Sequence, residues 1–210
     1  ADIKRTYKTE RRTQIMSAAE AALNLPVKDS NVKEDKDGRF IVMPDGSFKL
    51  ISNRAWSQAS PDSQGNTISE TISYSFTATN VHNVCAFTDL GNYVFIDIDE
   101  LEEVRLRSRG TTLQKVCKDA LKNERIVAAF DIKALIDKNL YFDTAEGKVK
   151  KTAASEYNLN KNDYAAIVLS DSYRLIGVEV EEEGKSILFA TKDGMVLNTE
   201  TDEYPLQGRK

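Results

Sequence analysis

The stretch "YFDTAEGKVKKTAASEY", residues 141–157, begins with two aromatic residues, continues through a short turn to Gly147 and then carries three lysines. A glycine at the end of such a turn can adopt the positive φ that a tight hairpin requires. The stretch therefore predicts a β-hairpin. Whether this hairpin stands alone depends on how often the same pattern occurs in the 210-residue chain.

The pattern occurs four times. The segments are "RFIVMPDGSFKLIS" (39–52), "VCAFTDLGNYVFID" (84–97), "LYFDTAEGKVKKTA" (140–153) and "ILFATKDGMVLNTE" (187–200). Their turn glycines, Gly46, Gly91, Gly147 and Gly194, recur at intervals of about 45 to 55 residues, which is typical of propeller blades. The positions five and six before each glycine, and two after it, are apolar in all copies. The chain therefore carries four equivalent predicted hairpins.

Further strand-like runs lie between the hairpins, at residues 67–76, 125–132, 164–169 and 173–182. Each repeat thus offers about four strands, the content of one propeller blade. We predict a mainly β fold, a propeller-like β-pinwheel of repeated four-stranded blades over residues 31–210. Apolar residues at helical spacing in 10–25, followed by Pro26, predict a short N-terminal α-helix and linker within residues 1–30.

Composition and motifs argue against several classes of protein. No run of about 18 apolar residues occurs, so no membrane-spanning helix is predicted. Cys85 and Cys117 lack metal-binding spacing and are interpreted as thiols in a reducing compartment. The single histidine, His82, has no nucleophile placed beside it in sequence, and no phosphate loop or nucleophile elbow is present. We predict no catalytic residue, no metal site and no cofactor in this chain.

The basic residues are the candidates for function. The net charge of −4 disfavours nucleic-acid binding, but binding depends on how charge is distributed. Lys148 and Lys150 alternate along one predicted strand with Lys151 beside them, and cations placed at comparable positions on successive blades would form a curved stripe for backbone phosphates. The ordinary alternative is that these side chains only solvate exposed strands. The other candidates are an alternating arginine set, Arg105, Arg107 and Arg109, and a weaker set, Lys49, Arg54, Arg174 and Arg209.

These residues lie in stretches that resemble a known family. The order "GKVKKTAASEY", "LIGVEV", "ILFATKDG" and a closing Pro-x-x-Gly-Arg closely resembles the C-terminal β-pinwheel of bacterial type IIA topoisomerase A subunits, from DNA gyrase and topoisomerase IV. Residues 84–113 resemble a further blade and lean toward topoisomerase IV, and "YKTERRTQI" is similar to the end of the helical arm. The resemblance is weakest over residues 28–80. The stretch 53–71 lacks the consecutive arginines of the gyrase wrapping box, which favours a topoisomerase IV-like or diverged gyrase subunit.

The resemblance implies a non-catalytic domain that binds and bends double-stranded DNA. Such a domain guides the duplex to the cleavage gate during ATP-dependent supercoiling, relaxation or decatenation, and its basic rim would here be the residues named above. ATP and magnesium would belong to other domains of a bacterial, cytoplasmic, nucleoid-associated enzyme, and a topoisomerase B subunit would be a partner through the rest of the A subunit. The family disc has five or six blades, so four hairpins imply an incomplete disc from a larger subunit. We also expect acidic residues to gather away from the rim.

Two alternatives from other classes remain open at this point. A propeller-type protein-interaction platform without nucleic-acid binding is favoured by the net charge of −4 and by the acidic runs "DIDELEE" and "EVEEEG". A standalone enzyme is disfavoured because no catalytic constellation occurs. Salt dependence separates the first alternative from DNA binding, because neutralising several phosphates makes affinity fall steeply as salt rises.

Overall fold

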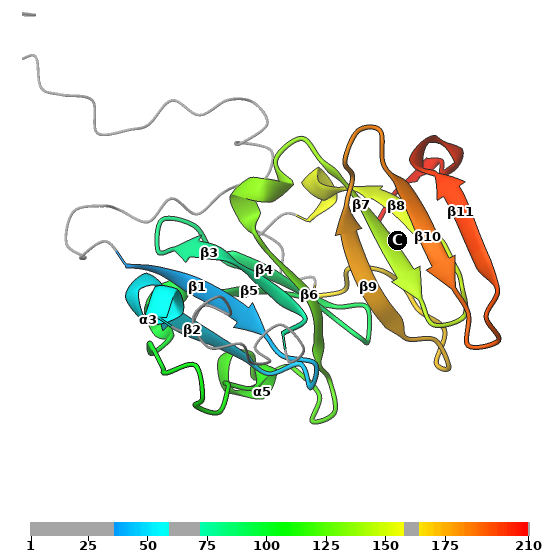
Figure 1. Ribbon diagram of the computed structural model, residues 1–210. Coiled ribbons are helices and arrows are strands. Elements are labelled where there is room, and N and C mark those ends of the chain that lie inside the picture. The colour runs from blue at the N-terminus through cyan, green and yellow to red at the C-terminus, as the bar shows by residue number, and fades with distance from the viewer. Residues whose placement is uncertain (1–35, 59–71, 158–163, 210) are drawn as a thin grey trace, which may run out of the picture.

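A computed structural model of the chain describes residues 36–58, 72–157 and 164–209. The predicted N-terminal helix, the expected domain boundary near residue 30 and most of the stretch 53–71 lie outside these residues, so the division into domains stays a prediction. The described part is mainly β and is built from hairpins that follow one another across the molecule (Figure 1). Each hairpin with its neighbouring strands is called a blade below.

The four blades correspond to the four sequence repeats. Blade 1 has the strand order β2-β1-β3 and blade 2 has the order β5-β4-β6. Blade 3 has the order β12-β8-β7-β9, and blade 4 is the hairpin β10-β11. The strands of blades 1 and 2 are β1 (Asp37–Val42), β2 (Phe48–Ser52), β3 (Tyr74–Thr79), β4 (Val84–Thr88), β5 (Tyr93–Ile96) and β6 (Ile126–Asp131). Those of blades 3 and 4 are β7 (Asn139–Thr144), β8 (Val149–Ala153), β9 (Leu175–Val180), β10 (Ser186–Ala190), β11 (Val196–Glu200) and β12 (Leu206–Gln207).

Helical segments are short and connect the strands. The α-helices are α3 (Asn53–Gln58) and α5 (Leu113–Val116), and the 3-10 turns are η2 (Ile98–Glu100), η3 (Ile132–Leu135), η4 (Ala154–Glu156) and η5 (Thr201–Glu203). No helix in the described part is long and apolar enough to cross a membrane.

The four hairpin turns have the same geometry. Gly46, Gly91, Gly147 and Gly194 have φ angles of 79°, 78°, 78° and 79°. In each turn the glycine N–H donates to the carbonyl three residues earlier, at distances between 2.9 and 3.0 Å. Residues other than glycine rarely adopt such φ values, so the recurrence of glycine has a direct conformational cause.

The core lies between blades 1 and 2 and between blades 2 and 3, because the hairpin faces that meet there are apolar. Residues at six and four positions before a turn glycine face the next blade: Phe40 and Val42 pack against blade 2, and Cys85 and Phe87 against blade 3. Residues at seven and five positions before it face the previous blade, as Leu140 and Phe142 do toward blade 2. Alternation along a strand sends successive side chains to opposite faces, so one hairpin contributes to two clusters.

Blades 1 to 3 are each completed by a segment that follows the next hairpin, which we call the return segment. The chain after the hairpin of blade 2 comes back to β2, where Glu103 pairs with Leu50 in parallel and Thr111 pairs with Phe48. The chain after the hairpin of blade 4 comes back as β12 and pairs in parallel with β8. The outer edges of blades 1 and 3 are therefore closed by residues that belong to the next repeat.

The return segment of blade 2 differs from its sequence prediction. The sequence predicts a strand over residues 164–169, but within this segment only Ala165 makes a bridge, to Asn92. The N–H groups of Ala166 and Ile167 both donate to the carbonyl of Gly91, at 2.8 and 3.0 Å. Because both bonds converge on one carbonyl, the segment curls around the hairpin turn and does not extend along β5. Among the described residues, four regular strands, as predicted for every blade, occur only in blade 3.

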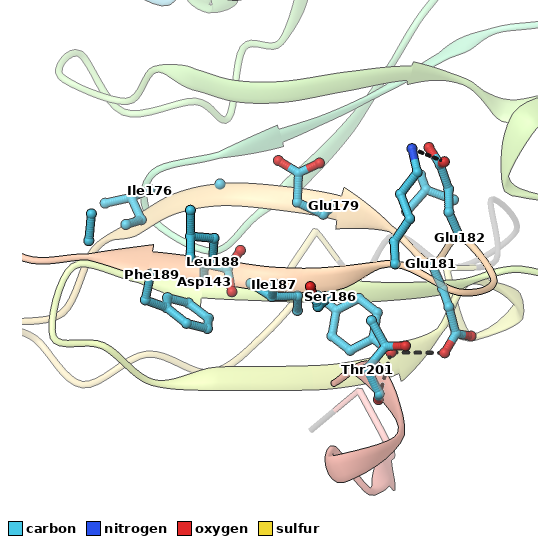
Figure 2. A pocket seen from close by; sticks show the side chains of 15 residues that line it. Asp143, Ile176, Glu179, Glu181, Glu182, Ser186, Ile187, Leu188, Phe189 and Thr201 are labelled. Carbon is cyan, nitrogen blue, oxygen red and sulfur yellow. Dashed lines mark hydrogen bonds and ion pairs between the residues drawn. The ribbon is translucent and has the colours of Figure 1, made fainter. Parts of the chain in front are cut away.

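The boundary between blades 3 and 4 is polar, unlike the other two. Tyr141 and Asp143 occupy the positions that face blade 4, and Glu179 on β9 lies opposite Tyr141 in the sheet register. Together with Ile187 and Phe189 of β10 they line a groove of about 540 Å³ between β9 and β10 (Figure 2). The buried clusters of the described chain include no residue of β10 or β11. Blade 4 therefore shares little core with the rest of the molecule.

The carboxylate of Asp143 should make stability depend on pH. Burial raises the pKa of Asp143 from 3.8 to about 6, and the neighbouring Glu179 adds to the rise. The folded protein thus binds the proton more tightly than the unfolded chain, so stability should fall as pH rises from about 4 to about 6. We expect Asp143→Asn to raise the free energy of unfolding by about 1 kcal/mol at pH 7, after allowance for partial exposure, and to leave it unchanged near pH 4. Chemical denaturation at both pH values measures this, and an equal effect at the two would contradict it.

Candidate nucleic-acid interface

The arginine set lies on the return segment that closes the outer edge of blade 1. Arg105, Arg107 and Arg109 are exposed, and no ion pair involves them in the described part of the chain. Their alternation in the sequence predicts one face of a strand. The structure has a turn instead, in which the Ser108 N–H donates to the Arg105 carbonyl at 2.9 Å. The three guanidinium groups therefore extend from a compact loop at the blade edge, which we call the arginine loop.

Lys49 lies beneath this loop and is buried. It is only 6% exposed, and its ammonium group donates to the carbonyls of Leu106 and Ser108, at 2.5 and 3.2 Å. Burial lowers the pKa of Lys49, and Asp45 partly offsets this. The structure thus separates Lys49 from the exposed cations with which the sequence grouped it.

Lys148 and Lys150 lie at the outer side of blade 3, just before β8 and within it, but have different surroundings. Lys148 is exposed, and its Nζ lies 4.8 Å from the centroid of the Tyr173 ring. Such a cation–π contact orients an ammonium group without neutralising its charge. Lys150 is half-buried and donates to the carbonyl of Arg209 at 3.0 Å. Burial lowers the pKa of Lys150, and Glu156 acts in the opposite direction. Lys148 is therefore better placed than Lys150 to meet a ligand.

Lys151 points to the opposite face of β8 and is part of a polar network. Its ammonium lies 2.5 Å from a carboxylate oxygen of Glu181 and 5.4 Å from the centroid of the Tyr141 ring. Glu181 also accepts from the Tyr141 hydroxyl at 2.8 Å and from Asn139. The hydrogen bond to Glu181 raises the pKa of Lys151, so this charge is firmly paired. The expected separation of carboxylates from the lysines does not hold here.

The weaker candidates are scattered. Arg54 is exposed on α3, after the last strand of the first hairpin. Arg174 is exposed just before β9, and its guanidinium donates to the carbonyls of Asp171 and Tyr173. Arg209 lies beside β8 and donates to the Tyr93 hydroxyl at 3.2 Å. The structure does not bring these three together with the arginine loop.

The structure adds Arg125, which was not among the cations predicted from the sequence. The carbonyls of Arg125 and Arg174 accept from the N–H groups of Asp89 and Ala145, both at 2.9 Å, immediately after the bulges in blades 2 and 3. The two arginines are therefore equivalent. The Arg125 side chain is 60% exposed, and Nε lies 3.6 Å from a carboxylate oxygen of Asp89. The signal was present in the sequence, because "ERIV" and "YRLI" both place an arginine one residue before the strand.

The exposed cations of blades 1 and 3 can serve a common ligand at the outer side of the molecule. The strand β6 contacts both β3 and β9, so β2 and β8 lie toward the opposite, outer ends of their sheets. Guanidinium and ammonium groups at these edges can bind phosphate oxygens, and guanidinium does so through two parallel hydrogen bonds. Contacts to phosphates fix a duplex in position without reading its bases.

Known proteins are similar to this chain in sequence. The family described as "DNA gyrase C-terminal domain, beta-propeller" matches residues 140–180 and 185–210. The chain is 26% identical to the A subunit of DNA topoisomerase 4 from Bacillus subtilis over 213 residues, which is 99% of this chain and 26% of that protein. The chain is similar to the C-terminal domains of type IIA topoisomerase A subunits. It is also 29% identical to the A subunit of DNA gyrase from Deinococcus deserti over 125 residues, which is 59% of this chain and 15% of that protein.

Solved structures share the fold of this chain. The C-terminal domain of DNA topoisomerase IV superimposes with a TM-score of 0.67 at 20% identity, over 85% of this chain and 56% of that one. The E. coli ParC C-terminal domain gives a TM-score of 0.57 at 15% identity, over 83% of this chain and 71% of that one. The propeller-like β-pinwheel predicted from the sequence is thus confirmed. The chain spans about a quarter of the length of the Bacillus subtilis relative, 26%.

Proposed function

We propose that this chain forms the C-terminal domain of a topoisomerase A subunit, and that it binds and bends double-stranded DNA along the outer edges of its blades. The observation that carries the proposal is the arginine loop of blade 1, where Arg105, Arg107 and Arg109 are exposed and lack ion pairs within the described residues. Three guanidinium groups that have no ion pair among the described residues place positive charge close together on a chain whose net charge is −4. Lys148 extends the positive edge to blade 3.

The edge placement favours bending over base recognition. Cations on successive blades would meet phosphates at positions along a curved path, and a duplex that follows the path has to bend. Smooth bending of a short duplex costs on the order of a few kcal/mol, which several phosphate contacts can offset. In the complete enzyme such a bend would lead the duplex toward the cleavage gate during ATP-dependent supercoiling, relaxation or decatenation.

The proposal extends to the setting of the domain. ATP and magnesium would act in other parts of the enzyme, and the B subunit would associate through the rest of the A subunit. The enzyme would work on the nucleoid in the bacterial cytoplasm.

Binding of the chain to a duplex of about 40 base pairs, measured over a series of salt concentrations, tests the proposal. Three or more phosphate contacts predict that log Kd rises with log salt concentration with a slope of about 2.5 or more. Two duplexes of unrelated sequence should bind equally, because phosphates carry no sequence information. Fluorophores at the two duplex ends should approach each other on binding if the duplex bends. No binding at low salt would overturn the proposal and would favour a protein-interaction platform.

A further inference from the structure

We propose that Lys49 is a positioning residue of the arginine loop, which holds the loop in its binding shape without touching DNA. The inference rests on the proposed function, because it explains how Arg105, Arg107 and Arg109 are presented to phosphates. The sequence alone groups Lys49 with the phosphate-contacting cations. The structure assigns it a different task.

The contacts of Lys49 fall between the arginines. Its ammonium group donates to the carbonyls of Leu106 and Ser108, the two residues that alternate with the three arginines. Fixing these two carbonyls fixes the backbone on either side of Arg107 and next to Arg105 and Arg109. Lys49 is only 6% exposed, and two of the three N–H donors of its ammonium group bind these carbonyls. The side chain is therefore poorly placed to bind an external phosphate.

The middle of the loop has few other restraints. Its ends are tied to β2, where the Val104 N–H donates to the Leu50 carbonyl and Phe48 exchanges hydrogen bonds with Thr111. Between these ties the backbone makes one bond of its own within the described chain, from Ser108 to Arg105. Without the Lys49 ammonium, the carbonyls of Leu106 and Ser108 would lose their protein donor. The loop would then be free to turn these carbonyls to water and to change shape.

Blade 3 uses the same device. Lys150 lies three residues after Gly147, as Lys49 lies three residues after Gly46, and both side chains point to the corresponding face of their hairpin. The Lys150 ammonium donates to the carbonyl of Arg209, which follows the return strand β12. In two blades, therefore, the lysine three residues after the turn glycine binds the return segment, and both return segments contain arginine. This recurrence argues that the contact of Lys49 is part of how the blade edge is built.

The test compares the salt dependence of duplex binding in Lys49 variants. Each phosphate contact contributes about 0.9 to the slope of log Kd against log salt concentration. If Lys49 positions the loop, Lys49→Met should lose the contribution of the arginines together, a fall in slope of about 2 or more. If Lys49 itself binds a phosphate, the slope should fall by about 0.9, which would overturn the inference. Lys49→Arg, which keeps donors for the two carbonyls, should restore most of the slope.

A matched control and a second variant secure the interpretation. Lys36 donates in the same manner to the carbonyls of Ile98 and Leu101, at the start of the same segment and away from the arginines. Lys36→Met should leave the slope unchanged. An equal fall in slope in both variants would overturn the inference, because Lys49 would then only support the blade in general. If Lys49→Met does not fold, Lys49→Gln replaces it. Gln keeps an N–H donor and removes the charge, so positioning predicts an almost unchanged slope and direct contact predicts a fall of about 0.9.

Hydrogen exchange in the absence of DNA provides an independent readout. The Ser108 amide should exchange faster in Lys49→Met than in the wild type, because its bond to Arg105 depends on the loop shape. Unchanged exchange at this amide would overturn the inference. If the wild type binds DNA and Lys49→Met loses the slope of only one contact, the inference about Lys49 is overturned and the proposed function stands. If the wild type shows no salt-dependent binding, the proposed function is overturned together with the role of Lys49 in it.

Discussion

Replacement of Arg105, Arg107 and Arg109 together by glutamate is expected to weaken duplex binding by at least about a hundredfold at 0.1 M salt. At this concentration each lost phosphate contact costs close to a factor of ten through counterion release, and the introduced carboxylates add repulsion. The three side chains are exposed and carry no ion pair within the described residues, so their replacement should leave the free energy of unfolding nearly unchanged. Fluorescence anisotropy with a labelled duplex, together with a thermal melt, measures both quantities.

A second triple variant with the same change in net charge is the control. Lys115, Lys118 and Lys122 are exposed on α5 and the loop after it, and none of them belongs to the arginine loop. Their replacement by glutamate should weaken binding much less, by about tenfold or below, through long-range repulsion only. Equal losses in the two triple variants would show that only the total charge matters. The arginine loop would then have no special role.

Replacement of Phe87 by alanine is expected to have the largest effect on stability, a loss of about 3 to 5 kcal/mol in the free energy of unfolding. Phe87 is fully buried in the cluster between blades 2 and 3. Its ring meets the rings of Phe130, Phe142 and Tyr157 edge to face, with centroids 6.3, 5.4 and 5.6 Å away. Alanine would leave a cavity and remove three aromatic contacts, of which those to Phe142 and Tyr157 join blade 2 to blade 3. Chemical denaturation measures the loss.

Leu188→Ala in blade 4 is the matched control for the loss of apolar surface. Leu188 lies on β10 and is 67% exposed. Its truncation should change the free energy of unfolding by less than about 0.5 kcal/mol. A loss close to that of Phe87→Ala would mean that blade 4 is packed more tightly than the structure describes.

Local sequence signals were sufficient to predict the hairpins and which faces of their strands are buried. A turn glycine and the alternation of apolar residues act over a few positions, so Gly147 and the residues before it predict both the turn and the two buried faces. The return segments could not be predicted in this way. The shape of residues 164–169 is set by the carbonyl of Gly91, more than 70 residues earlier in the chain, and no local pattern contains that contact.

The candidate site was predictable only in part, for a related reason. The sequence pointed to Arg105, Arg107 and Arg109 because three arginines at alternate positions are conspicuous. It could not separate Lys49 from Lys148, since both are lysines shortly after a turn glycine. The difference arises because a distant segment covers Lys49 and leaves Lys148 open, and burial by a distant segment is a tertiary property.

The return segments also determine the order in which the protein can form during its synthesis. Blade 1 ends with β3, yet its outer edge is closed by residues around 103–111, which leave the ribosome only after the hairpin of blade 2 has been made. The outer edge of blade 3 is likewise closed only after β12 has been synthesised. A nascent chain therefore always exposes one unpaired edge while the next repeat is translated, and such an edge can pair with another chain. Translation speed between repeats, and not only the final fold, should then govern how much of this protein reaches its native state.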